Sequence, residues 1–175
     1  ELNAIVQTAD GGYICGGVSN SLISGDKTED SFQAYDDYWV VKLDTSGTIE
    51  WQNTIGGDEG DILTSIQQTI DGGYICGGFS GSPISGDKTE NTLGGDDYWV
   101  VKLDASGAIE WQNSIGGSGS EYLYAIQQTE DGGYFCGGYS NSPVSGDKSE
   151  GSRGLFDYWV VKLDSMGVVE WEKTV

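Results

Sequence analysis

Apolar and polar residues alternate in short runs along this chain, and the runs return in a fixed order. The stretch Ile49–Ile55 is mostly apolar at its odd positions, with Glu, Gln and Thr between them. This period of two is typical of a strand with one face covered. The stretch Tyr38–Leu43 is apolar at nearly every position, which predicts a strand covered on both faces. Two further runs, Ala4–Thr8 and Tyr13–Val18, complete a set of four predicted strands.

Glycine-rich segments and one long loop join the predicted strands. Asp10-Gly11 predicts a type I′ hairpin turn between the first two strands, because both central residues of that turn need positive φ. Gly16 and Gly17 in the second strand carry no side-chain bulk, which suits the close approach of a neighbouring sheet. The segment Asp44–Gly47 predicts the turn before the fourth strand. The four strands therefore form an antiparallel meander.

The whole pattern occurs three times. DGGYICGG begins at Asp10 and Asp71, and DGGYFCGG begins at Asp131, so the step is close to 60 residues. A step of this length is typical of one four-stranded sheet per repeat. The predicted fold class is all-β, with three four-stranded antiparallel meander repeats. We assign the repeats, which we expect to form one cooperative domain, to residues 1–60, 61–120 and 121–175.

Composition agrees with strands and tight turns, since 29 of the 175 residues are glycine and only 2 are proline. The chain has 28 acidic and 8 basic residues and no histidine, which gives a formal net charge of −20. Such a surface repels nucleic acids and anionic membranes, so we expect neither nucleic-acid binding nor membrane insertion. It attracts cations, and calcium is the one cofactor that this composition suggests.

Cys15, Cys76 and Cys136 occupy equivalent positions in the three repeats. Their number is odd and none has a nearby partner in sequence, so we expect no disulfide framework. We interpret them as small buried apolar residues. A three-thiolate metal site is the alternative, and it would require the three side chains to converge on one axis.

The motifs SGDKTE, DYWVVKLD and SGTIEWQNTIGG together resemble a repeat found in many large secreted and surface proteins of Gram-negative bacteria. The resemblance covers essentially the whole chain, and it is specific for the repeat and not for a function. It implies a β-propeller-like fold, in which each repeat is one blade, and an extracellular or cell-surface location. The segment LDTSGTIEW is also similar to the turn of tryptophan-docking propellers, although it is one residue shorter.

Three blades do not close a propeller, which typically has about four to eight. Three arrangements therefore stay open. The chain is a fragment of a longer propeller, or two copies close a six-bladed ring, or the fold is a β-trefoil of three four-stranded repeats. The propeller-like arrangement is favoured, and it predicts contact with neighbouring repeats or self-association.

The long loops and the connections between repeats are expected on one face of the molecule, which we call the long-loop face. Binding sites usually lie in long loops on a rigid scaffold. Each long loop repeats the motif Asp-Lys-x-Glu, whose oxygen atoms could bind calcium. The alternative, which the sequence favours, is a structural motif in which Asp caps a turn and Lys pairs with an acid. The candidate ligand-binding residues are Asp26, Lys27, Glu29, Asp87, Lys88, Glu90, Asp147, Lys148 and Glu150. The candidate metal ligands are Asp26, Glu29, Asp87, Glu90, Asp147 and Glu150.

Aromatic residues fall into two groups. Trp39, Trp51 and their equivalents lie at strand positions and are predicted to be in the core. Phe32, Tyr35 and Phe156 lie in the long loops and differ between repeats, so they join the candidate binding residues. Rings that stack on sugar faces would make a carbohydrate-binding site, and solitary half-buried loop anchors are the alternative.

Catalysis finds little support in the sequence. Without histidine, the usual base for serine or cysteine nucleophiles is missing, so we expect no enzyme. The leading hypothesis is a non-catalytic extracellular module for binding or adhesion, with a glycan or protein ligand on the long-loop face. The first alternative is a structural, self-assembling spacer repeat, because uncapped β repeats expose apolar faces and strand edges. The second is a carbohydrate-active enzyme or its accessory domain.

Overall fold

The computed structural model describes all residues from Glu1 to Val175 and contains twelve strands in three separate antiparallel sheets. Sheet 1 consists of β1 (Leu2–Gln7), β2 (Tyr13–Ser19), β3 (Asp37–Leu43) and β4 (Ile49–Ile55). Sheet 2 consists of β5 (Asp61–Gln68), β6 (Tyr74–Ser80), β7 (Asp97–Leu103) and β8 (Ile109–Ile115). Sheet 3 consists of β9 (Glu121–Gln128), β10 (Tyr134–Ser140), β11 (Asp157–Leu163) and β12 (Val169–Thr174). The only helix is a short 3-10 turn at Phe32–Ala34, and no helix could cross a membrane.

The predicted all-β fold with three four-stranded antiparallel meanders is confirmed. The first strand of each repeat begins earlier than predicted. A shift of register interrupts the alternation there, between Leu2 and Ala4 in sheet 1 and between Leu63 and Ser65 in sheet 2. Such an irregularity breaks the period of two on which the prediction depends.

The hairpin between β1 and β2 is present, but the predicted turn type is wrong. Gly11 has a φ of +86°, whereas Asp10 is not among the residues with positive φ, so the turn is not type I′. The Asp10 carboxylate instead accepts hydrogen bonds from the Thr8 hydroxyl and from the Gly12 amide, the latter at 2.9 Å. These bonds hold a longer loop, in which only the glycine needs the left-handed region.

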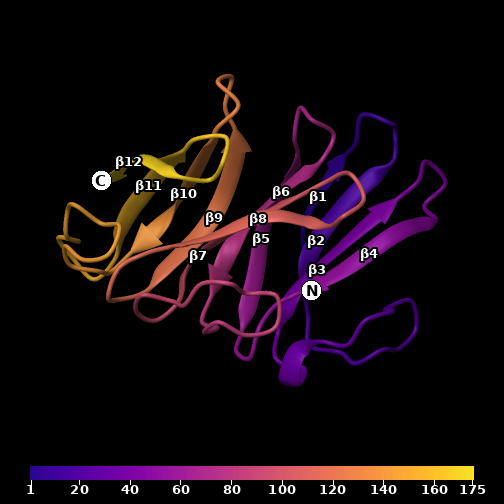
Figure 1. Ribbon diagram of the computed structural model, residues 1–175, viewed down its shortest axis with the longest axis horizontal. Helices are drawn as coiled ribbons and strands as arrows, with labels where there is room; N and C mark the ends of the chain where they lie inside the picture. Colours follow the sequence, from indigo (N-terminus) through magenta and orange to yellow (C-terminus); the bar gives the residue numbers. More distant parts are fainter.

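The sheets stack face to face in chain order, and Figure 1 shows them following one another across the molecule. Strand β5 lies against β1, β2 and β3, and β9 lies in the same way against β5, β6 and β7. We call the two faces of each sheet the tryptophan face and the tyrosine face. In sheet 2 the tryptophan face carries Cys76, Trp99 and Val101. The tyrosine face carries Ile75, Tyr98 and Val100.

Each internal junction packs the tyrosine face of one sheet on the tryptophan face of the next. Nearly all of the core lies in these two junctions. The first buries Ile14, Tyr38, Val40, Ile55, Leu63, Ile66, Tyr74, Cys76, Trp99, Val101 and Leu103. The second buries Ile75, Tyr98, Val100, Ile115, Leu123, Ile126, Tyr134, Cys136, Trp159, Val161 and Leu163. Every residue of β7 is buried, so the prediction of a third strand covered on both faces is confirmed in the second repeat. It is wrong for Tyr38–Leu43 itself, because no sheet covers one face of β3 and Trp39, Val41 and Leu43 are only partly buried.

The stack has two uncovered ends, and some predicted core residues lie there. Trp171 is 50% exposed, and Cys15 and Trp39 are only partly buried, because no further sheet covers these faces. The three cysteines form no disulfide. The sheets close no ring, and they share no interstrand ladder from which the barrel of a trefoil could form.

Candidate functional site

The residues of the Asp-Lys-x-Glu motif attach each long loop to the neighbouring strands. The lysine of each motif points into the protein, and Lys27, Lys88 and Lys148 are at most 4% exposed. The Lys27 ammonium donates to the hydroxyl of Thr54 at 2.9 Å, and Lys148 donates to the equivalent hydroxyl at 2.8 Å. Burial lowers the pKa of Lys88. Each lysine therefore fastens its long loop to the fourth strand of its own sheet.

The aspartate of the motif fastens the loop to the preceding repeat. The Asp147 amide donates to the Gly116 carbonyl at 2.8 Å, and the Gly116 amide donates to the Asp147 carboxylate at 3.0 Å. Asp87 makes the same two contacts with Gly56. Asp26, in the first repeat of the structure, makes no such contact, and its exposed side chain forms no hydrogen bond.

The glutamate of the motif bonds to the fourth strand. The carboxylate of Glu29 accepts from the Thr54 amide at 2.6 Å, and Glu90 accepts from the Ser114 amide at 2.8 Å. Glu150 forms an ion pair with Lys173 instead. These contacts favour the structural interpretation of the motif.

The structure shows no three or more His, Cys, Asp or Glu side chains gathered as a metal site. Calcium binding by the six loop acids stays a prediction, and thermal melting tests it. Calcium at millimolar concentration should raise the melting temperature if the loops bind it, and an unchanged melting temperature would remove this cofactor.

The three candidate loop aromatics lie in different surroundings. Phe32 is half-buried and packs on the second long loop. Its ring lies so close to Gly86 that a Cβ added to this glycine would be 2.9 Å from it. Tyr35 is exposed. Phe156 is also exposed, and its ring centroid lies 5.0 Å from that of Tyr139.

Phe156 belongs to a third-repeat aromatic cluster, which comprises Tyr122, Tyr124, Tyr139 and Phe156. A groove of about 340 Å³ lies beside it, lined by Tyr139, Phe156, Asp157, Tyr158 and Val175. Tyr124 and Tyr139 are not among the candidate residues that the sequence predicts. Comparison of the repeats could have found them, since Tyr139 stands where the other repeats have Val18 and Phe79.

The two open end faces are the largest departure from the internal pattern. Ile5 on the tryptophan face of sheet 1 is 59% exposed, whereas its equivalent Ile66 is 4% exposed. Tyr158 on the tyrosine face of sheet 3 is 72% exposed, whereas Tyr98 is fully buried. Side chains that form the core inside the chain therefore face solvent at both ends.

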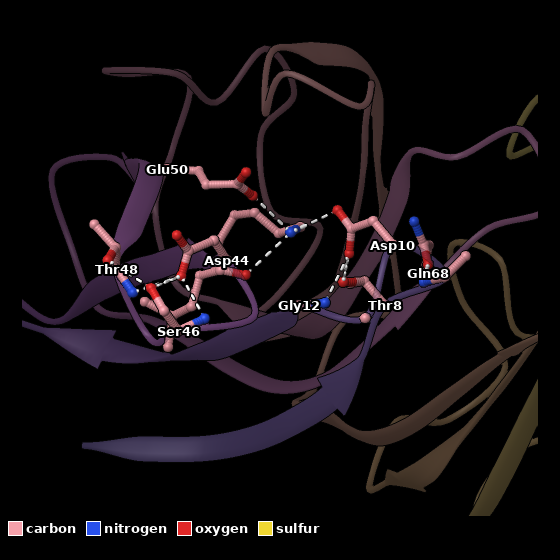
Figure 2. Close-up of polar contacts among 12 residues, drawn as sticks. Thr8, Asp10, Gly12, Asp44, Ser46, Thr48, Glu50 and Gln68 are labelled. Atoms are coloured by element: carbon pink, nitrogen blue, oxygen red, sulfur yellow. Dashed lines mark hydrogen bonds and ion pairs between the residues drawn. The ribbon is translucent and has the colours of Figure 1, made fainter.

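A lysine joins two carboxylates on the opposite side of each repeat from the long loops. Lys42 forms ion pairs with Asp10 at 2.9 Å and with Glu50 at 2.7 Å, and its ammonium also donates to the Leu43 carbonyl. Figure 2 shows the two carboxylates on either side of the ammonium, with Asp10 in the β1–β2 turn and Glu50 near the start of β4. Burial opposes the charge of Lys42, but its bonds to both carboxylates raise its pKa. This bridge ties the β1–β2 hairpin to β4.

Buried carboxyl groups lie at the junctions between repeats. Asp37 and Asp97 are fully buried, and burial raises the pKa of each to about 7. The nearby charge of Glu121 raises the pKa of Asp97 further. One oxygen of each aspartate has no hydrogen-bond partner. The carboxyl groups of Asp37 and Asp97 therefore keep their protons at pH values below about 7.

No known protein family matches this sequence, and no curated protein is similar enough to count as a relative.

Proposed function

We propose that the chain is a non-catalytic, β-propeller-like repeat module with a structural role, which joins further sheets of the same kind at both open ends. The observation that carries this proposal is the exposure of two faces whose equivalents form the core of the chain. A repeat contacts only its neighbours, so the terminal repeats need either a polar cap or another repeat. Here both outer faces are apolar.

The composition of the exposed faces supports this function. Large contiguous apolar patches on a soluble protein usually mark an interaction surface. The tryptophan face of sheet 1 exposes Leu2, Ile5 and Tyr13, and the tyrosine face of sheet 3 exposes Phe135 and Tyr158. Inside the chain, faces of these two kinds pack on each other.

Extension of the chain by one sheet tests the proposal. Residues 56–115 would be joined after Val175, which places a copy of sheet 2 after sheet 3 with the natural connection. We expect Tyr158 to become buried and the free energy of unfolding to rise. A matched extension with an aspartate in place of the appended copy of Leu63 should lose this gain. The proposal is wrong if both extended chains melt like the original.

Binding of a glycan or protein ligand through the long-loop face is the second candidate function. The third-repeat aromatic cluster favours it, because exposed rings beside a groove can stack on sugars. Retention on immobilised polysaccharides should fall for Tyr139→Ala, a substitution of the β10 member of the cluster, while Tyr35→Ala, at an exposed aromatic residue outside the cluster, serves as the control. Absence of any retention would count against this function. An exported location accompanies both candidates as a prediction.

A further inference from the structure

We propose that the open tyrosine face of sheet 3 binds the open tryptophan face of sheet 1 in a second copy of this chain. This inference rests on the proposed function and names the partner. The contact is made twice within one chain, between sheets 1 and 2 and between sheets 2 and 3. Its third occurrence is left unmade, with one half at each end of the stack. The two copies therefore join head to tail.

A glycine on the tyrosine face shows that the third contact has room for a partner. A Cβ on Gly77 would lie 2.8 Å from Leu123 and 3.0 Å from Ile126, because these side chains of the next sheet fill the space above the glycine. A Cβ on the equivalent Gly137 would meet nothing within 4 Å. Sheet 3 thus presents the same depression without its occupants.

The matching occupants are exposed at the other end of the chain. Leu2 and Ile5 are the equivalents of Leu123 and Ile126, and they are 62% and 59% exposed. In a second copy docked head to tail, Leu2 and Ile5 fill the space over Gly137. Their burial removes apolar surface from water at both partners.

A hydroxyl group shows the same pattern. The Tyr38 hydroxyl donates to the Trp99 carbonyl at 2.9 Å, and the Tyr98 hydroxyl donates to the Trp159 carbonyl at 2.9 Å. The third tyrosine of this series is Tyr158, which makes no such bond in the chain. The Trp39 carbonyl of the second copy is its equivalent acceptor. This bond fixes the register as well as the direction of the contact.

The fourth strand supplies a third matching contact. Trp111 packs on the turn at Gly167, where a Cβ would lie 2.6 Å from the ring, and its centroid lies 5.6 Å from that of Tyr134. The equivalent Trp171 is half-exposed, and the equivalent turn at Gly47 has nothing packed on it. Trp171 of one copy therefore meets the Gly47 turn of the other.

Two polar contacts across the junction differ in the third repeat, and both positions keep a donor. Thr64 donates to the Leu123 carbonyl at 2.7 Å, and Tyr124 stands at the equivalent position of sheet 3. Asn113 donates to the Gly167 carbonyl at 2.7 Å, and Lys173 stands at the equivalent position of sheet 3. The Lys173 ammonium pairs with Glu150 in the chain and has further N–H groups that can donate to the Gly47 carbonyl of the second copy.

Two single substitutions block the two halves of the junction separately. Gly137→Leu fills the depression on the tyrosine face, and Ile5→Asp places a charge on the tryptophan face, where burial would be costly. Both positions face open space in the single chain, so both variants should fold like the natural chain and should melt like it at concentrations low enough to keep it monomeric. Melting temperature and circular dichroism check this for each variant.

Light scattering across a concentration series then measures the assembly. We expect the natural chain to reach twice its single-chain mass or more, and each variant alone to remain a monomer or to associate far less. An equimolar mixture of the two variants should form dimers, because each contributes one intact face. A head-to-tail contact closes into a ring or extends into a row, and the same junction serves both.

Three results would overturn this inference. The natural chain remains a monomer at all concentrations, or Ile5→Asp alone still dimerises through its tyrosine face, or the mixture stays monomeric. The proposed function fails separately. If the natural chain is monomeric while the chain extended by residues 56–115 gains stability, further sheets cover the ends but a second copy does not.

Discussion

The close packing of glycine against the next sheet gives a sharp test of the sheet junctions. In Gly77→Ala the added Cβ would lie 2.8 Å from Leu123, so the junction must shift to accommodate it. We expect a loss of roughly 1–3 kcal/mol in the free energy of unfolding, which is typical of overpacked cores. Urea titration measures this change.

At concentrations where the chain is monomeric, Gly137→Ala is the matched control, because the same change then occurs in the same sequence context over open space. Its free energy of unfolding should stay within about 0.5 kcal/mol of that of the natural chain. Equal losses in the two variants would show that glycine acts through the backbone and not through the junction.

The buried aspartates predict that stability falls as pH rises towards neutrality. The pKa of Asp37 and that of Asp97 are raised to about 7, mainly by burial, whereas the unfolded chain releases these protons near 3.8. Between these values the native state binds more protons than the unfolded state. Each group can therefore remove up to about 1.4 kcal/mol of stability per pH unit in this window. The melting temperature should be higher at pH 5 than at pH 8.

Asp97→Asn removes one of these groups while it keeps the size of the side chain. Its melting temperature should depend less on pH between about 4 and 7 than that of the natural chain. Asp58→Asn, an exposed acid on a connection, should leave the profile unchanged. A natural chain that melts at the same temperature across this range would contradict the prediction.

At the scale of single residues, the sequence showed which side chains could bind a ligand but not whether they lie on the surface or in the interior. Lys88 was a candidate ligand because it lies in a long polar loop, yet it is 2% exposed and its ammonium lies 5.3 Å from the Trp99 ring. Only the fold brings these residues together, since they come from different elements. The predicted burial of the free cysteines is confirmed for Cys76 and Cys136, whereas Cys15, at the same position of its repeat, is only partly buried because no sheet covers its face.

At the scale of elements, the second and third long loops each bond to the end of the preceding sheet, through Asp87 and Asp147. The first long loop makes no such contact. Asp147→Ala removes the bond from the Gly116 amide, whereas Asp26→Ala removes a side chain with no hydrogen bond. We expect Asp147→Ala to lower the free energy of unfolding by about 1 kcal/mol and Asp26→Ala to leave it unchanged. Chemical denaturation of both variants measures the difference.

This pair also separates the two interpretations of the Asp-Lys-x-Glu motif. A purely structural motif gives unequal losses in the two variants. A motif that binds the same ligand in every repeat gives equal losses of ligand affinity with no difference in stability. The second outcome would contradict the role of this loop in holding neighbouring sheets together.

Strand bounds were predictable where alternation is regular and not where it breaks. The fourth strand of repeat one, Ile49–Ile55, is confirmed residue by residue. The second repeat's first strand begins at Asp61, four residues before Ser65, which is the equivalent of the predicted start at Ala4, because the register shifts between Leu63 and Ser65. The apolar and polar pattern of a single strand does not show where its register against the neighbouring strand shifts.

At the scale of the whole molecule, the number of sheets could be predicted from the threefold sequence, but their closure could not. Closure depends on the angle between successive sheets, which no residue encodes on its own. The sequence does contain the chemistry of the ends, because Tyr158 repeats Tyr98 and Ile5 repeats Ile66. Because the repeats have nearly the same sequence, the outer faces of sheets 1 and 3 carry the same apolar residues as the inner faces. No polar residues replace them to cap either end.

Net charge predicts how the assembly of two copies responds to salt. Each chain carries −20, so two copies together carry −40, and their mutual repulsion opposes the contact of the apolar end faces. Added salt screens this repulsion over a Debye length of about 10 Å at 0.1 M, while burial of apolar surface changes little. The association constant should therefore rise with sodium chloride concentration, measured by light scattering or sedimentation. Ile5→Asp should stay monomeric at every salt concentration. Dissociation on addition of salt would indicate a junction held by ion pairs, contrary to the apolar contact of Gly137 with Leu2 and Ile5.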